Sequence, residues 1–353
     1  MNNFGLKSIT YNKEKLKFIP SYLLNFLEFE RGLDDFTPEF PDKYYLYTGR
    51  GPSYSSFHIG HIMSLILILE FQKYLKNKIY FMISDDEKIF RDNIMTEKME
   101  LNVQKTIKQL NKIGFNDDNT YIHINSKGIS EDNYKLIIKL TNTCTINELS
   151  KIFGTKKYIG EYFYVFYQLM PCFINPNKQC IVIAGIDQEP FFRLARDIAE
   201  KIKYPKPIIL YTKNIPGLDG SIKMSTSNLL SNPIFIDDTL ETIKYKIMSI
   251  KQVGAGTLNE LFEFGSNLDK DIPFKIIDIF DTNRHNVDLI KKGYTSGVIT
   301  DSLEHINLKL IMSEKGIQTR ENKTMVTSYG IRIYLINLIN GIVSFINIPN
   351  SIY

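Results

Sequence analysis

The sequence predicts an α/β fold, with a parallel β-sheet domain that carries a helical insertion and an all-α C-terminal domain after it. Short β-rich runs alternate with stretches of helical length up to about residue 211. The strand candidates end in turns rich in glycine or acidic residues, and helical periodicity dominates from about Asp237 onwards. Strands that alternate with helices are typical of βαβ units, so we expect a Rossmann-like sheet.

The first βαβ unit is predicted from three consecutive segments. Residues 44–48 form a β-rich run that ends at Gly-Arg-Gly-Pro. The apolar stretch from His58 through Leu75 is long enough for a buried helix. A second strand is predicted at Ile79–Ile83, directly before Asp85-Asp86-Glu87.

The segment from about residue 95 to 165 has a mostly helical, amphipathic pattern, and we interpret it as the helical insertion in the sheet domain. Further strands are predicted at Gln179–Ala184 and from Ile208, with a helix from Pro190 to about Lys203 between them. Single cores rarely grow beyond about 250–300 residues, and the chain has 353. We therefore expect two domains, at residues 1–236 and 237–353.

Composition limits the possible classes of protein. Hydrophobic residues at 43%, charged residues at 23% and a net charge of +4 fit a globular protein and would suit an RNA partner. The three cysteines form no Cys-x-x-Cys pair, which argues against structural zinc and suits a reducing compartment. The apolar segment Ile331–Ile348 contains Arg332 and several asparagines, which would be costly in lipid. We predict a cytoplasmic protein with no membrane role.

Two motifs carry most of the chemical information: His-Ile-Gly-His at 58–61 and Lys-Met-Ser-Thr-Ser at 223–227. A helix that opens at His58 would direct backbone N–H groups at an anion. His58 and His61 are three residues apart, so both can donate to one phosphate. Gly60 would let a nucleoside approach the backbone closely. Taken singly, each motif also fits capping histidines or a solvated lysine.

Lys223 lies in a loop rich in glycine and serine, which could close over phosphates while the lysine neutralises departing pyrophosphate. A carboxylate that attacks an α-phosphate is already ionised near neutral pH, so no catalytic base is needed. The pattern therefore predicts adenylation by ATP, with His58, His61 and Lys223 as catalytic residues. Mg²⁺ is expected with the ATP, and no tightly bound metal or organic cofactor is expected.

Several runs in this order resemble class I aminoacyl-tRNA synthetases, and among them the eukaryotic and archaeal tryptophanyl-tRNA synthetases. The resemblance spans about residues 4–330. Tyrosyl-tRNA synthetase, the nearest relative, lacks the acidic run after the second strand. The runs that carry the resemblance are Tyr-Leu-Tyr-Thr-Gly-Arg-Gly-Pro-Ser (45–53), Asp-Asp-Glu-Lys (85–88), Ile-Asp-Gln-Glu-Pro-Phe-Phe-Arg (186–193), Tyr-Pro-Lys-Pro (204–207) and Gly-Tyr-Thr-Ser-Gly (293–297).

The resemblance implies roles for individual residues. Tyr47 would contact the indole of tryptophan, while Glu87, Gln168 and Gln188 would hold its ammonium group. The family has a glutamine that helps recognise the indole N–H at the position of Met82, so Tyr47 alone is expected to read that nitrogen here. The residues implied for ATP binding are Thr48, Gly49, Arg50, His58, Gly60, His61, Asp187, Lys223, Met224 and Ser225.

The implied function is activation of L-tryptophan to tryptophanyl-adenylate and its transfer to tRNA. The resemblance further implies a homodimer, with residues 237–353 as the anticodon-binding domain. Two alternatives stay open. One is a tyrosine-specific homologue, because of Met82; the other is an inactive synthetase-like RNA-binding or regulatory protein. The presence of His58, His61 and Lys223 argues against the second.

Overall fold

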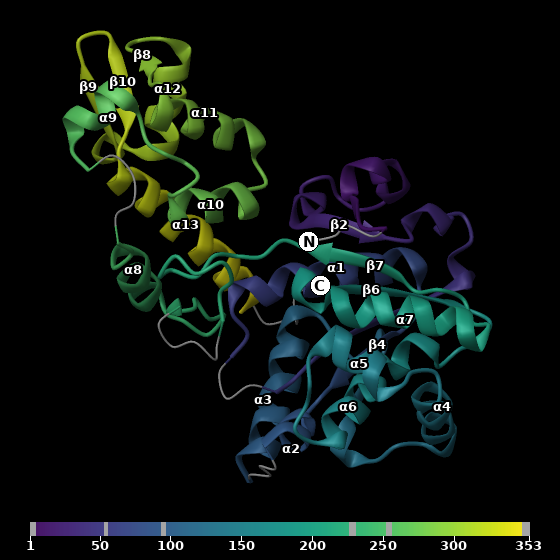
Figure 1. Ribbon diagram of the computed structural model, residues 1–353. Coiled ribbons are helices and arrows are strands. Elements are labelled where there is room, and N and C mark those ends of the chain that lie inside the picture. The colour runs from purple at the N-terminus through teal and green to yellow at the C-terminus, as the bar shows by residue number, and fades with distance from the viewer. Residues whose placement is uncertain (1–4, 53–55, 93–96, 226–230, 252–255, 348–353) are drawn as a thin grey trace. The chain divides into compact units, whose positions relative to one another are not determined.

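The computed structural model describes residues 5–52, 56–92, 97–225, 231–251 and 256–347 (Figure 1). Packing divides the chain into two compact units. Unit 1 contains the chain up to Phe57 and His61–Lys213, and unit 2 contains His58–Gly60 and the chain from Asn214. The domain boundary at 236/237 stays a prediction, because these units are defined by packing and not by function.

Seven strands of the described part of unit 1 form one mixed sheet, in the order β1-β2-β7-β6-β3-β4-β5. The five strands from β7 to β5 are parallel, whereas β2 pairs antiparallel with both β1 and β7. The parallel α/β sheet predicted from the sequence is thus confirmed. Their bounds are Lys7–Ser8 (β1), Leu27–Arg31 (β2), Tyr44–Arg50 (β3), Ile79–Ile83 (β4), Thr120–Ile124 (β5), Gln179–Gly185 (β6) and Ile208–Thr212 (β7).

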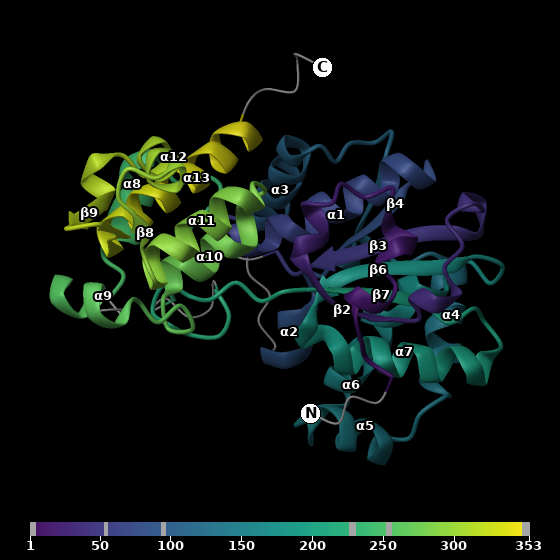
Figure 2. The ribbon, with the colours of Figure 1, turned by 90° about the horizontal axis from the view of Figure 1, so that it is seen from above.

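Helices cover both faces of this sheet. Figure 2 shows α1 and α3 on one face and α6 and α7 on the other. The second face carries a large buried cluster in which tyrosines of the strands pack against α6 and α7. The helices of unit 1 are α1 (Ile59–Leu75, its first two residues in unit 2), α2 (Glu87–Asp92), α3 (Glu97–Ile113), α4 (Glu131–Thr141), α5 (Ile146–Phe153), α6 (Ile159–Leu169) and α7 (Glu189–Ile202).

The region interpreted as a helical insertion contains a strand that the sequence analysis missed. β5 lies within residues 95–165 and extends the main sheet by pairing parallel with β4. β5 is five residues long and follows the turn-forming run Asn116-Asp-Asp-Asn. Helices that precede and follow β5 dominate the local pattern, so periodicity over a long window hides so short a strand.

Unit 2 is mainly helical, as predicted, but it also contains an antiparallel sheet in the order β8-β10-β9. The expectation of an all-α region missed these strands, which are two to four residues long. The elements are α8 (Leu240–Met248), α9 (Leu258–Phe264), α10 (Ile272–Phe280), α11 (Arg284–Thr295), β8 (Val298–Ile299), α12 (Leu303–Met312), β9 (Ile317–Arg320), β10 (Lys323–Val326) and α13 (Ser328–Ile346).

Helix α13 is long and apolar enough, by length and composition, to cross a membrane. In the structure it packs against α8 and α10 of the same unit, and Leu335 and Ile339 are fully buried. The Asn347 side chain, at its C-terminal end, donates to the Ile236 carbonyl at 2.8 Å. These contacts bury one part of α13 within its own unit, and 39% of its apolar stretch is buried.

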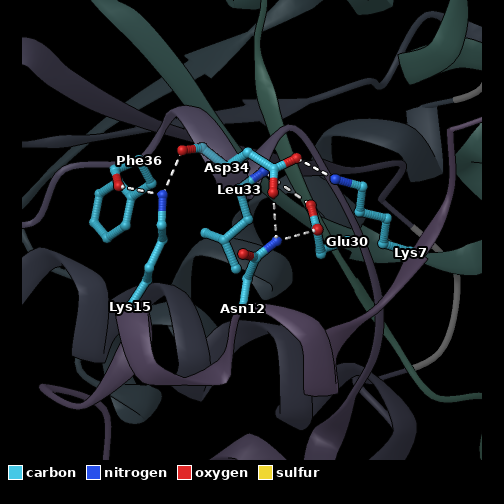
Figure 3. A network of polar contacts seen from close by, with 7 residues as sticks. All are labelled: Lys7, Asn12, Lys15, Glu30, Leu33, Asp34 and Phe36. Carbon is cyan, nitrogen blue, oxygen red and sulfur yellow. Dashed lines mark hydrogen bonds and ion pairs between the residues drawn. The ribbon is translucent and has the colours of Figure 1, made fainter.

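A polar network ties the N-terminal segment to the end of β2 (Figure 3). Asn12 donates from Nδ2 to Glu30 at 2.7 Å and to Asp34 at 3.0 Å. The fully buried Glu30 also accepts the backbone N–H of Leu33 at 2.8 Å. At the exposed side, Lys7 pairs with Asp34. Burying a carboxylate is tolerable only when donors satisfy it, so Asn12 is the important partner.

We expect Asn12→Ala to lower the free energy of unfolding by about 1–3 kcal/mol, because it removes a donor from the buried Glu30 carboxylate. Urea unfolding followed by circular dichroism measures the change. Lys7→Ala is the matched control in the same network, and its effect should be small because the Lys7–Asp34 pair is exposed. Equal losses for the two variants would contradict this account.

Candidate functional site

The strands β3 and β6 stop pairing at the point where the predicted site residues begin. Their register runs from Tyr44 to Tyr47, which pairs with Val182. Beyond it, the Thr48 hydroxyl donates to the Ile183 carbonyl at 3.1 Å. From β3 the sheet continues to β4 and β5, and from β6 it continues to β7, so this is the topological switch point. Ligands of open α/β sheets bind at the carboxyl ends of such strands.

Tyr47 connects the sheet to α6 at this point. Its hydroxyl donates to the backbone carbonyl of Gln168 at 2.7 Å and lies 3.7 Å from the Met82 sulfur. Tyr47 is 3% exposed, and burial raises its pKa well above the usual value. Three of the predicted substrate-binding residues are thus brought together.

The two predicted glutamines are also in contact. Gln168 donates from Nε2 to the side-chain oxygen of Gln188 at 2.8 Å, and Gln188 donates to Asp187 at 3.1 Å. A Cβ on Gly185 would lie 2.6 Å from the Asp187 carboxylate. Glycine at the end of β6 therefore lets this carboxylate turn back over the strand.

The acidic run after β4 is anchored by β5 and the turn that follows it. Asp85 accepts the backbone N–H of Ser126 at 2.9 Å, and Asp86 accepts Asn125 Nδ2 at 2.8 Å. Burial raises the pKa of Asp86 to about 6. Glu87 begins α2, and its carboxylate would lie 3.3 Å from a Cβ on Gly51. Asp85 and Asp86 thus hold this edge together, and Glu87, the predicted contact of the substrate ammonium group, follows them at the start of α2.

Tyr164 belongs to this group, although the sequence analysis did not single it out. Its hydroxyl forms a hydrogen bond with Ser84. The pKa of Tyr164 is raised, mainly by burial and next by the nearby Glu87 carboxylate. Tyr164 precedes Gln168 by four residues, so both side chains lie on one face of α6. That spacing was the available signal for it.

Arg50 ends β3 beside an aromatic ring. Its guanidinium carbon lies 4.4 Å from the centre of the Phe57 ring, a cation–π arrangement. Burial lowers the pKa of Arg50 to about 9, so the group keeps its positive charge near neutral pH. The ring of His61 also lies edge-on to Phe57, at 5.9 Å between centroids.

Two of the backbone N–H groups at the start of α1, where the sequence predicts an anion site, have acceptors within the protein. Within unit 2, Ile59 donates its N–H to Ile234 at 3.0 Å, and Gly60 donates its N–H to His58 Nδ1 at 3.1 Å. A Cβ on Gly60 would lie 3.0 Å from two ring atoms of His58. Gly60 therefore makes room for the imidazole. Because Nδ1 accepts a hydrogen bond, a neutral His58 carries its proton on Nε2 and can donate a hydrogen bond from there.

Lys223 is exposed on a loop whose neighbouring residues are anchored in unit 2. Met224 is buried and donates its N–H to Ile215 at 2.6 Å. The Ser231 hydroxyl donates to the Ser225 carbonyl at 2.6 Å. Residues 226 and 227 of the motif, like Ser53, lie outside the described residues. The loop thus fixes Met224, the residue after Lys223, whereas Lys223 itself is exposed.

Comparison with known proteins places this chain in a family. A family model described as tRNA synthetases class I (W and Y) matches residues 42–310. The chain belongs to this synthetase family. The resemblance to tryptophanyl-tRNA synthetases stated from the sequence is also confirmed, since curated tryptophan–tRNA ligases match the chain.

Two relatives and one solved structure illustrate the similarity of this class I synthetase to others. Tryptophan–tRNA ligase of Encephalitozoon cuniculi is 32% identical over 302 residues, which cover 83% of this chain and 78% of that protein. The human cytoplasmic enzyme is 32% identical over 271 residues, 72% of this chain and 57% of that protein. The structure of the E. cuniculi tryptophanyl-tRNA synthetase bound to tryptophan aligns with a TM-score of 0.77, at 27% identity, over 98% of this chain and 91% of that one.

The raised pKa of Asp86 predicts a pH-dependent contribution to the stability of the synthetase. The folded state binds this proton more tightly than the unfolded state does, so the contribution of Asp86 is lost as pH rises from about 4 through 6. Asp86→Asn should therefore gain about 2 kcal/mol relative to the natural chain between pH 4 and pH 7. Urea unfolding at both pH values measures it. Asp118→Asn, which removes an exposed carboxylate, is the control, and parallel pH profiles for all three proteins would contradict the prediction.

Proposed function

We propose that this chain activates L-tryptophan with ATP to form tryptophanyl-adenylate and transfers the aminoacyl group to tRNA. The observation that carries the proposal is the connected set Tyr47–Gln168–Gln188–Asp187 at the switch point of a class I synthetase sheet. Such a set offers an apolar ring site at one end and several acceptor oxygens at the other.

The ammonium group of the amino acid would be bound by the side-chain oxygens of Gln168, Gln188 and Glu87. Two amide oxygens and one carboxylate match the three donors of an ammonium group. The hydrogen bond from Gln168 sets the orientation of the Gln188 side-chain amide and holds its oxygen in place. The phenol of Tyr47, whose proton is donated to the Gln168 carbonyl, keeps lone pairs that can accept the indole N–H.

The phosphates of ATP would be bound by groups that donate or carry positive charge. His58 would donate from Nε2, Arg50 would contribute its guanidinium group, and Lys223 would stabilise the charge that develops on pyrophosphate. The tryptophan carboxylate is itself the nucleophile at the α-phosphorus, so positioning and charge stabilisation carry the reaction. Mg²⁺ would enter with ATP, held by phosphate oxygens.

The remaining roles follow the sequence predictions. Residues 1–236 would form the catalytic domain and 237–353 the anticodon-binding domain of a cytoplasmic homodimer. The other predicted ATP contacts would be made by Thr48, Gly49, Gly60, His61, Asp187, Met224 and Ser225. The contact between Tyr47 and Met82 supports keeping a tyrosine-specific activity as the second candidate, because the thioether is a poor hydrogen-bond acceptor for an indole.

Amino-acid-dependent exchange of pyrophosphate into ATP tests the proposal. With tryptophan and tyrosine compared side by side, kcat/KM for tryptophan should exceed that for tyrosine by at least about 100-fold. Charging of tRNA with labelled tryptophan then tests the transfer step. Exchange supported by tyrosine and not by tryptophan would overturn the amino-acid assignment, and no exchange with any amino acid would favour a regulatory protein.

The packing of Gly60 on His58 predicts a selective effect on ATP. In Gly60→Ala the new Cβ would displace the imidazole, so the KM for ATP in the exchange reaction should rise about tenfold, with little change in the KM for tryptophan. Gly341→Ala is the matched control in another helix, because none of the described atoms lies within 4 Å of its added Cβ. Equal KM values for ATP in the two variants would argue against a role of His58 in phosphate binding.

A further inference from the structure

His123 lies next to Met82 in the sheet, although nothing so far gives it a role. It is the residue of β5 that pairs with Met82 of β4, and Met82 pairs in turn with Gly49 of β3. Paired residues of parallel neighbouring strands point to the same face, about 4.8 Å apart. The imidazole therefore stands beside the thioether that touches the Tyr47 hydroxyl.

The side chain of His123 is buried and incompletely bonded. It is 5% exposed, and its Nε2 has no hydrogen-bond partner among the described residues. Burial lowers the pKa of His123, so the ring is neutral near pH 7 and one of its nitrogens is a lone-pair acceptor. A buried imidazole nitrogen without a partner costs free energy, which a ligand that supplies a donor would recover.

Of three buried tyrosines near His123 on this face, two have partners for their protons and one is an exception. Tyr167 donates to the Asn125 carbonyl at 3.1 Å, and Tyr47 donates to the Gln168 carbonyl at 2.7 Å. The exception is Tyr80, whose buried hydroxyl also has no partner in the described part of the chain. The rings of Tyr80 and His123 lie 5.6 Å apart. Of these groups, the imidazole is the stronger acceptor.

We propose that His123 is a specificity residue of the amino-acid site, whose neutral imidazole accepts a hydrogen bond from the indole N–H alongside the Tyr47 oxygen. The inference rests on the proposed tryptophan activation. Met82 on β4 cannot accept the indole N–H, so the proposal assigns this polar contact to the adjacent strand, β5. His123 lies there directly opposite Met82. The ring site is thereby polar on its β5 side and apolar at Met82.

Pyrophosphate exchange with tryptophan and with its benzothiophene analogue, in which sulfur replaces the indole N–H, tests this role. The natural chain should prefer tryptophan, and His123→Phe should lower the ratio of the two kcat/KM values roughly tenfold, through tryptophan only. Adding Met82→Gln to His123→Phe should restore the ratio, because an amide oxygen then stands on β4. Tyr80→Phe, which removes the other unpartnered group, should leave the ratio unchanged.

The outcomes distinguish a failure of this inference from a failure of the proposed function on which it rests. An unchanged ratio in folded His123→Phe, or a fall in Tyr80→Phe in its place, would show that His123 is not the acceptor. If His123→Phe does not fold, His123→Gln keeps an acceptor of similar reach and must retain the ratio. Absence of tryptophan-dependent exchange in the natural chain would instead refute the proposed function.

Discussion

The hydrogen bond from the Tyr47 hydroxyl to the Gln168 carbonyl is the constraint on which the rest of the site depends. It joins the sheet to α6 where the pairing of β3 with β6 ends, and so fixes Gln168 opposite Gln188. Without it, a buried carbonyl near the end of α6 would lose its partner, and the Gln168 amide would no longer be held toward β6. One phenol thus serves both the fold and the proposed recognition of the substrate.

At the start of α1, backbone N–H groups have hydrogen-bond acceptors within the protein. Its first N–H groups are satisfied by Ile234 and by the His58 ring itself. In the proposed ATP site, His58 would therefore donate to phosphate from Nε2, the tautomer that follows from the hydrogen bond that Nδ1 accepts from Gly60. The absence of a Cβ at Gly60, the glycine between the two histidines, makes room for this ring.

Much of the fold could be predicted from the sequence where elements are long or sharply bounded. β4 has the predicted bounds because turn residues flank its apolar run, and α1 ends at Leu75 as expected. The sequence analysis missed β5 and the strands of unit 2 because they are short and lie among helices. For the site, the resemblance to tryptophanyl-tRNA synthetases implied Tyr47, Gln168 and Gln188, but the register that sets His123 beside Met82 exists only in three dimensions.

The tyrosines that face this site have an optical consequence. The sequence contains 21 tyrosines and no tryptophan, so the ultraviolet emission of the protein comes from phenols. Tyr47 and Tyr80, whose rings lie 6.3 Å apart, stand beside the proposed ring site. A bound indole would be the sole fluorophore of its kind and would receive excitation energy from these neighbours. Occupancy of the site would therefore be measurable from the wavelength of the fluorescence emission, without any label.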